Sequence, residues 1–224
     1  MPSSRPNAVP VVIHLIKQLQ PASILDVGVG FGKWGHLFRE YTDILASESD
    51  PARYRRENWQ VRIDGIEGFP DYITDMHRYL YNDIIIGDVR ECVTNLDTYD
   101  VVFLGDIIEH LPKQEGMQLL RSLLEKTQKA VIVSTPKYDT AQGALCHNEL
   151  ERHRSLWSAE DFLSFPCSRV ATITETLLVG VIGTNNVKLP RIEVEIAGRQ
   201  RTLLRRILGR AKRIVRSLIH RQLS

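Results

Sequence analysis

The stretch Ile24-Leu-Asp-Val-Gly-Val-Gly-Phe-Gly32 decides the fold. Together with Ser23, its apolar first half is typical of a buried parallel strand. Glycines then stand at alternate positions, and residues 33–41 carry apolar side chains at helical spacing. Glycines let a backbone turn tightly and approach a ligand, and the helix that follows offers unpaired N–H groups at its positive end. The stretch predicts a strand, a ligand-binding turn and a helix, although a glycine triplet alone also fits a turn that merely needs positive φ.

The rest of the chain alternates predicted strands and helices. Further strands are predicted at residues 61–67, 84–86, 100–104 and 130–134. Helices are predicted at residues 10–20 and 112–126, and Ser158-Ala-Glu-Asp161 is typical of a helix start. Strands separated by helices indicate a parallel sheet covered on both faces.

The C-terminal part of this region has a different pattern. Residues 169–176 and 177–184 predict two successive strands, and 187–196 predicts an edge strand. The expected fold class is therefore α/β: a Rossmann-like doubly wound sheet, mostly parallel, with an antiparallel strand near the C-terminal part and a basic C-terminal helix.

Composition excludes several classes of protein. The chain has 224 residues, 43% hydrophobic and 25% charged, which is the profile of a globular protein and not of a disordered or collagen-like one. The cysteines, Cys92, Cys146 and Cys167, are odd in number and form no CxxC, so we expect no disulfide framework, no metal site and a cytoplasmic location. No apolar window is long enough for a membrane span or a secretory signal.

Charge divides the chain into two parts. Residues 1–198 hold 20 basic and 27 acidic side chains, whereas residues 199–224 hold nine basic and no acidic ones. Apolar side chains recur in the second part at steps of three and four, so we expect a domain over 1–198 and a basic amphipathic helix over 199–224. That helix is suited to peripheral contact with an anionic inner membrane surface or to packing on its own domain. Nucleic-acid binding is not expected, because no basic module with interleaved aromatics is visible.

Four motifs occur in order along the chain. They are Ile24-Leu-Asp-Val-Gly-Val-Gly-Phe-Gly32, Asp64-Gly-Ile-Glu67, Gly87-Asp88 and Asp106-Ile-Ile-Glu-His-Leu111, each at the end of a predicted strand. Together they resemble class I S-adenosylmethionine-dependent methyltransferases over about residues 20 to 185. The resemblance implies S-adenosylmethionine as cofactor.

The resemblance also implies roles for particular residues. Gly28, Gly30 and Gly32 would lie under the amino acid and ribose of the cofactor, and Asp26 would help to hold its ammonium group. Glu67 would accept hydrogen bonds from both ribose hydroxyls, for which a carboxylate has the acceptors.

Two later motifs would complete the cofactor site. Asp88 would accept a hydrogen bond from the adenine amino group, Val89 would bond the ring through its backbone, and Asp106 would line the methionine end.

The ribose acceptor has a competitor. Glu67 lies 35 residues beyond Gly32, whereas the acid of a dinucleotide fold lies ~20 residues on. Residues 44–48 therefore form an alternative second strand with Glu48 as the acceptor. We prefer Glu67, because Val61, Ile63 and Ile66 make the better strand, and we interpret the polar residues 46–60 as an insertion.

Methyl transfer requires an aligned acceptor and, for a hydroxyl or protonated amine, removal of a proton. His110 and His153 are the candidate bases, because both follow expected carboxyl ends of strands, where open α/β sheets bind ligands. Each also fits a structural role, His110 in buttressing a loop and His153 at the surface. Trp157 and Tyr138 fit either the wall of an acceptor pocket or the core.

The predicted function is methyl transfer to a small-molecule, glycan or lipid-linked acceptor. One alternative is an NAD(P)-dependent oxidoreductase, since Gly30-Phe-Gly32-Lys-Trp-Gly35 satisfies the bare dinucleotide pattern but leaves Gly28 unexplained. Another is a non-catalytic scaffold that binds S-adenosylmethionine. The sequence does not identify the acceptor, because acceptor pockets are built from loops.

Overall fold

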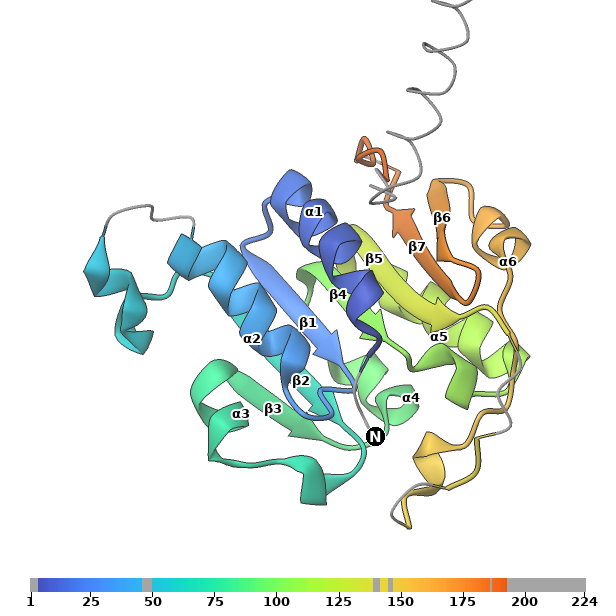
Figure 1. Ribbon diagram of the computed structural model, residues 1–224, viewed down its shortest axis with the longest axis horizontal. Helices are drawn as coiled ribbons and strands as arrows, with labels where there is room; N and C mark the ends of the chain where they lie inside the picture. Colours follow the sequence, from blue (N-terminus) through green and yellow to red (C-terminus); the bar gives the residue numbers. More distant parts are fainter. Residues whose placement is uncertain (1–3, 46–49, 139–141, 145–146, 186, 193–224) are drawn as a thin grey trace, which may run out of the picture. The chain divides into compact units, whose positions relative to one another are not determined.

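The computed structural model describes residues 4–45, 50–138, 142–144, 147–185 and 187–192. They contain a seven-stranded sheet of order β3-β2-β1-β4-β5-β7-β6 (Figure 1). The strands are β1 (Ser23–Val27), β2 (Arg62–Glu67), β3 (Asp83–Ile86), β4 (Tyr99–Gly105), β5 (Thr127–Pro136), β6 (Ser168–Thr174) and β7 (Leu177–Gly183). The first five strands pair in parallel, and β7 pairs antiparallel with both β5 and β6. The predicted fold class of the sheet is confirmed.

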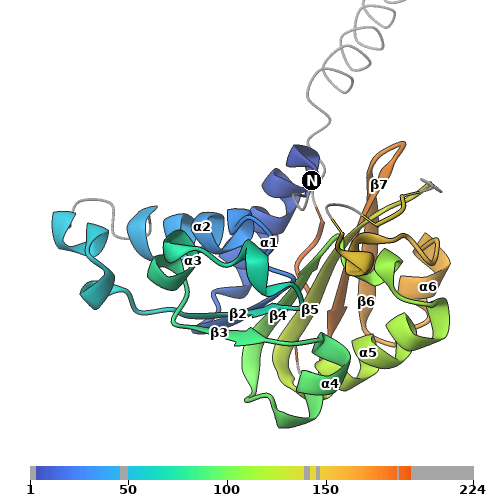
Figure 2. The same ribbon diagram turned by 90° about the horizontal axis from the view of Figure 1, so that it is seen from below.

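Helices cover both faces of the sheet (Figure 2). They are α1 (Val9–Leu19), α2 (Lys33–Arg39), α3 (Asp75–Leu80), α4 (Val89–Cys92), α5 (Lys113–Glu125) and α6 (Ala159–Leu163). Side chains alternate along each strand, so neighbouring residues enter different cores. Ile24 packs in the core under α1, α2 and α3, while Leu25 packs in the core over α4, α5 and α6. The fold is therefore a three-layer sandwich with an apolar core on each side of the sheet.

Local sequence explains where several elements begin and end. Ser158 and Asp161 form a capping box at the start of α6, as the sequence indicates. Gln20, in the left-handed conformation with φ of 44°, ends α1 just before Pro21. Asp88 accepts from the Arg90 N–H at 2.9 Å and so caps α4, a short helix that the strand pattern did not predict.

The alternative second strand is wrong within the described residues. Glu40–Ile44 continues α2 as a π-helical turn, and β2 pairs directly with β1, with Val27 opposite Ile66. Residues 50–60 contain two short 3-10 helices, Pro51–Tyr54 and Arg56–Asn58, which fits an insertion. Glu48 itself lies outside the described residues.

The predicted edge strand over 187–196 is wrong for residues 187–192, which are not a strand. They follow β7, whose two edges already pair with β5 and β6, so the chain finds no open edge there. Pro190 also lacks the N–H that a ladder needs. Leu189 instead inserts into the core beneath α1 and is 7% exposed.

Residues up to Glu193 form one compact unit. The predicted basic helix over 199–224 lies outside the described residues. Among the helices that are described, none has the length and apolar character needed to cross a membrane.

Candidate active site

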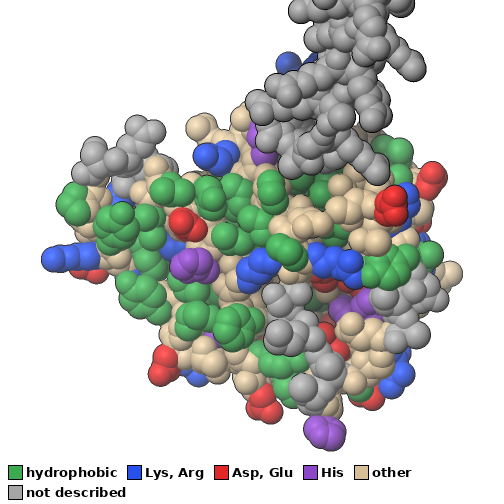
Figure 3. All heavy atoms as spheres, viewed as in Figure 1, with side chains coloured by type: hydrophobic (Ala, Val, Ile, Leu, Met, Phe, Trp, Pro, Cys, Tyr) green, Lys and Arg blue, Asp and Glu red, His purple; other side chains and the backbone are tan. Residues whose placement is uncertain are grey.

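A cavity of about 510 Å³ opens at the carboxyl ends of the parallel strands. This volume is in the ~300–1,000 Å³ range of small-molecule sites. The cavity lies where the strand order reverses, between β1 and β4, which is where open α/β sheets bind ligands. The loops after β1, β2, β3 and β4 line it, with residues 148–151, 153 and 154 and the N-terminal residues Ser4 and Arg5. Figure 3 shows acidic and histidine side chains in a hollow on this face.

The glycine turn forms one wall of the cavity. Gly28, Gly30 and Gly32 have φ values of 76°, 50° and 83°, a left-handed region that glycine enters without strain. The Gly28 N–H donates to the Ile66 carbonyl at 2.8 Å, and a Cβ at Gly28 would lie 2.1 Å from Ile107 Cδ1. Gly28 and Gly30 line the cavity, whereas Gly32 serves as the residue before α2.

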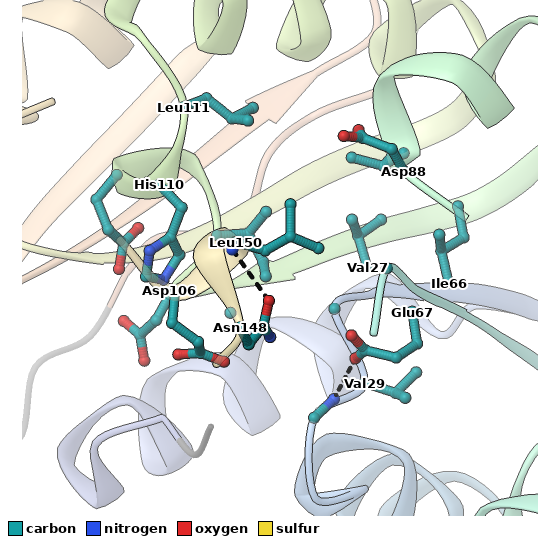
Figure 4. A pocket seen from close by; sticks show the side chains of 18 of the residues that line it. Val27, Val29, Ile66, Glu67, Asp88, Asp106, His110, Leu111, Asn148 and Leu150 are labelled. Carbon is teal, nitrogen blue, oxygen red and sulfur yellow. Dashed lines mark hydrogen bonds between the residues drawn. The ribbon is translucent and has the colours of Figure 1, made fainter. Parts of the chain in front are cut away.

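Glu67 ends β2 and faces the same turn (Figure 4). Its Oε2 accepts from the Gly30 N–H and its Oε1 from the Phe69 N–H, both at 2.9 Å. The residue is 6% exposed, and burial raises the pKa of its carboxyl while these N–H groups lower it. Each carboxylate oxygen accepts more than one hydrogen bond, so this fixed carboxylate keeps acceptors for a ligand.

Asp26 does not line the cavity as the sequence suggested. It shares the sheet face of Ile24, beneath the glycine turn, where it is fully buried and its Oδ2 accepts from the Tyr81 hydroxyl at 2.6 Å. Oδ1 has no hydrogen-bond partner among the described residues. Burial raises the pKa of Asp26 to about 7. Its place in the structure is therefore that of a support for the turn.

Asp88 and Val89 line the cavity after β3. The Asp88 carboxylate forms an ion pair with Arg90 at 2.5 Å, and Arg90 also bonds Glu115. These bonds to Arg90 hold the pKa of Asp88 below its usual value. The carboxylate is thus ionised and fixed at the start of α4, where the first N–H groups of a helix have no intrahelical acceptor.

Asp106 follows β4 and has a φ of 55°, unusual for a residue with a side chain. Its N–H donates to the Ser134 carbonyl at 2.8 Å, which joins the turn to β5. Burial raises the pKa of its carboxyl, and the Ser4 hydroxyl and the charges of Arg5 and Lys33 oppose that shift. The N-terminal segment therefore closes over this acid, since Lys33 Nζ also donates to the Ser4 carbonyl at 2.7 Å.

His110 and His153 come together although 43 positions separate them in the sequence. Their ring centroids are 4.9 Å apart, and the rings meet at 66°. Burial, and then the neighbouring His153, lower the pKa of His110 to about 4. A base with such a low pKa holds few protons near pH 7 and is weak, so His110 is poorly suited to proton abstraction.

Glu109 is the site residue that the sequence analysis missed. It is 2% exposed, lines the cavity, and accepts from the Thr135 hydroxyl at 3.0 Å. Glu109, His110 and His153 each offer a donor atom, and these atoms all lie within 4.8 Å of one another. The only signal in the sequence was the acid beside His110. The burial of that acid depends on a distant segment, whose Arg154 and Ser155 N–H groups both donate to the Glu109 carbonyl.

The two aromatics that the sequence left open do not line the cavity. Trp157 is 1% exposed and packs over Gly116 of α5 in the core, with its Nε1 donating to the Ile108 carbonyl at 3.1 Å. Tyr138 instead accepts a hydrogen bond from Arg5.

Comparison with known proteins finds similar structures but no similar sequences. No family model matches the chain, and no curated protein matches its sequence. Solved structures do match. The methyltransferase domain of bacterial CtHen1-C is 19% identical, with a TM-score of 0.52, over 80% of this chain and 98% of that one. DhpI in complex with SAH is 14% identical, with a TM-score of 0.52, over 79% and 85%.

A third match is PH0226 from Pyrococcus horikoshii OT3, 15% identical with a TM-score of 0.55 over 79% of this chain and 87% of that one. At these identities the matches show a similar backbone fold and do not by themselves establish a shared function. The chain has the fold of class I S-adenosylmethionine-dependent methyltransferases.

Proposed function

We propose that this protein is a methyltransferase that uses S-adenosylmethionine as methyl donor and acts on a small-molecule, glycan or lipid-linked acceptor. The observation that carries the proposal is Glu67, held at the end of β2 by the Gly30 and Phe69 N–H groups and facing the cavity. A carboxylate held in this way accepts from two adjacent ribose hydroxyls.

The charge of the cavity supports a cationic ligand over a dinucleotide. The Gly30 N–H, which could otherwise bind a phosphate, is taken by Glu67, so a pyrophosphate would meet a carboxylate there. Acidic side chains outnumber basic ones in the lining: Glu67, Asp88, Asp106, Glu109, Glu115, Glu149 and Glu151 against Arg5, Lys33, Arg90 and Arg154. A sulfonium and an ammonium suit such a field, whereas the diphosphate of NAD does not.

The proposed roles follow the lining residues. The backbone of Gly28 and Gly30 approaches the amino acid and ribose, Glu67 bonds the ribose, and Asp106 faces the methionine ammonium. At the other strand end Asp88 accepts from the adenine amino group and Val89 contributes backbone hydrogen bonding. Asp26 acts indirectly, beneath the turn.

Catalysis would consist mainly of alignment. In methyl transfer the bond from methyl to sulfur breaks as the bond to the acceptor forms, and the positive charge of sulfur disappears. The protein needs to hold the acceptor in line and exclude water. The cavity beside His110 and His153 provides the space, and these two imidazoles are the candidate bases for a hydroxyl acceptor.

Calorimetry with the full-length protein tests the proposal. We expect S-adenosylhomocysteine to bind with micromolar affinity and NAD to show no binding at millimolar concentration. Binding of NAD without S-adenosylhomocysteine would favour the oxidoreductase and contradict the proposal. Release of S-adenosylhomocysteine with a panel of hydroxyl-bearing acceptors then separates an enzyme from a binding scaffold.

A further inference from the structure

Glu109 is a buried carboxylate whose two oxygens differ in their hydrogen bonding. It is 2% exposed, and the Thr135 hydroxyl satisfies Oε2 at 3.0 Å. The other oxygen, Oε1, has no hydrogen-bond partner among the described residues. Burial, together with the nearby Asp106, raises the pKa of Glu109 well above its usual value. A buried acceptor without a hydrogen-bond partner lowers the stability of the fold by ~1–3 kcal/mol, and by more when it is charged. Such a group is therefore expected to bind a proton, an ion or a ligand.

Two imidazoles stand beside this carboxylate. His110 belongs to the same turn after β4, and its buried Nδ1 also has no hydrogen-bond partner among the described residues. His153 comes from the segment that crosses the cavity, and its backbone N–H donates to the Gln142 carbonyl at 3.0 Å. The two rings meet edge to face, and a ring nitrogen of each lies within 4.8 Å of the other.

We propose that Glu109, His110 and His153 form a binding site for one divalent transition-metal ion. One donor atom from each side chain lies within 4.8 Å of the other two. Ligands ~2.1 Å from a shared ion lie at most ~4.2 Å apart, so small side-chain rotations bring the three into range. Two further observations support the site independently of this spacing. Within the described residues, the buried Oε1 of Glu109 and the buried Nδ1 of His110 each have no hydrogen-bond partner.

The donor set selects the kind of ion. Imidazole nitrogen suits Zn²⁺, Fe²⁺, Co²⁺ and related ions, whereas Mg²⁺ and Ca²⁺ prefer oxygen ligands alone. Three protein ligands leave positions open for water or substrate, which is the arrangement of a catalytic and not of a structural metal site. An ion here would also neutralise the acidic surroundings, where Asp106 and Glu151 add to the charge of Glu109.

The site also bears on the acceptor, a step that rests on the proposed function. In Figure 4 His110 and Asp106 lie on the opposite side of the cavity from Glu67 and Ile66. A metal at the His110 side would therefore leave the ribose region clear. Its open positions would bind an acceptor through oxygen, lower the pKa of that hydroxyl and orient it, so with the ion bound His110 and His153 would serve as ligands and not as the base. The acceptor class would narrow to molecules with a hydroxyl able to reach the ion.

Metal binding is measured directly on the full-length protein after treatment with a chelator. We expect Zn²⁺ and Co²⁺ to bind with one equivalent at micromolar affinity or tighter by calorimetry, and Co²⁺ to give a visible absorption band from protein ligands. Mg²⁺ should bind at least about 100-fold more weakly. Absence of Zn²⁺ and Co²⁺ binding at millimolar concentration would overturn the proposal.

Variants locate the ion. Glu109→Gln keeps the size of the side chain and its acceptor for Thr135, and we expect it to weaken Zn²⁺ binding at least about 10-fold. His153→Asn should do the same, and because His153 lies half-buried outside the two cores, this variant tests the site even if Glu109→Gln unfolds. Glu149→Gln is the matched control, since Glu149 also lines the cavity but forms an ion pair with Arg152. Its affinity should stay within about twofold of wild type.

The outcomes separate the two proposals. Wild-type affinity in both Glu109→Gln and His153→Asn, or an equal loss in Glu149→Gln, would show that the ion binds elsewhere. Zn²⁺ is titrated without S-adenosylhomocysteine, and S-adenosylhomocysteine is titrated in the presence of chelator. Metal binding without S-adenosylhomocysteine binding would support the metal site and reject the proposed function, and the converse would reject the metal site alone.

Discussion

Glu67 and Glu109 both carry buried carboxyl groups that line the same cavity, but they differ in their hydrogen bonding. Two backbone N–H groups satisfy Glu67, one on each oxygen. Glu109 has the Thr135 hydroxyl on one oxygen and no partner on the other among the described residues. The first arrangement is complete before a ligand arrives and suits neutral hydroxyl donors. The second is incomplete and calls for a cation or a proton.

The test with the largest expected effect removes the Glu67 carboxylate. Glu67→Ala deletes a charged acceptor for two ribose hydroxyls, and each hydrogen bond to a charged group contributes ~1.5–3 kcal/mol. We expect affinity for S-adenosylhomocysteine to fall at least about 100-fold by calorimetry. Glu48→Ala is the control, because Glu48 is the competing acid from the sequence, and its effect should stay within about threefold. A larger loss in Glu48→Ala would transfer the ribose role to that residue.

The second test concerns the turn that holds Glu67 in place. Gly28→Ala puts a side chain at a φ of 76° and a Cβ against Ile107, so we expect the free energy of unfolding to fall by about 2 kcal/mol or more. Chemical denaturation measures the change. Gly143→Ala is the matched control. Within the described part of the chain, its two sequence neighbours aside, no heavy atom lies within 4 Å of the Cβ position, so its effect should stay within about 0.5 kcal/mol. Equal stability of the two variants would show that the turn tolerates a side chain.

The sequence predicted the Glu67 side of the cavity better than the Glu109 side, and the reason is physical. The glycine turn and the end of β2 are encoded locally, by alternating glycines and by an apolar strand that ends in an acid. β2 also pairs with β1, so its carboxyl end meets the turn once the order of strands is known. The positions of Gly28, Gly30 and Glu67 could be anticipated for that reason, whereas their roles stay predictions.

The other side is assembled by long-range folding. Whether Glu109 is a solvated loop acid or a buried one depends on residues 147–157, which donate two backbone N–H groups to its carbonyl. No local period encodes that return. The Asp26–Tyr81 pair was missed for a similar reason, since Tyr81 follows α3, a short helix that no apolar repeat indicated.

Asp26 provides the third test. It is another buried carboxyl, and among the residues that the structure describes one of its oxygens has no hydrogen-bond partner and no imidazole donor is grouped with it. Its pKa of about 7 lies above the unfolded value of 3.8, so between these values the native state keeps a proton that the unfolded state has lost. The free energy of unfolding should therefore fall as pH rises from about 4 and level off above about 7.

The variant Asp26→Asn removes this titration and keeps an acceptor for Tyr81. Denaturation at pH 5 and pH 8 should show wild type losing up to about 3 kcal/mol more stability than the variant over this interval. Glu67, Asp106 and Glu109 have raised pKa values too and titrate in both proteins, so the difference between the two profiles reports Asp26 together with its charge interaction with Glu67. Parallel pH profiles would mean that Asp26 is ionised in the native state.

The test with the smallest expected effect asks whether the Glu67 side and the Glu109 side of the cavity bind their ligands independently. His153→Asn should change the affinity for S-adenosylhomocysteine, measured in chelator, by less than about twofold. The side chain belongs to the Glu109 side, and the substitution retains the backbone bonds of its segment, from His153 to Gln142 and from Arg154 and Ser155 to Glu109. The double variant with Glu67→Ala should then bind as the sum of the single effects, within ~0.5 kcal/mol. A larger coupling would mean that the two sides of the cavity act as one site, and the carboxylates could no longer be assigned separate ligands.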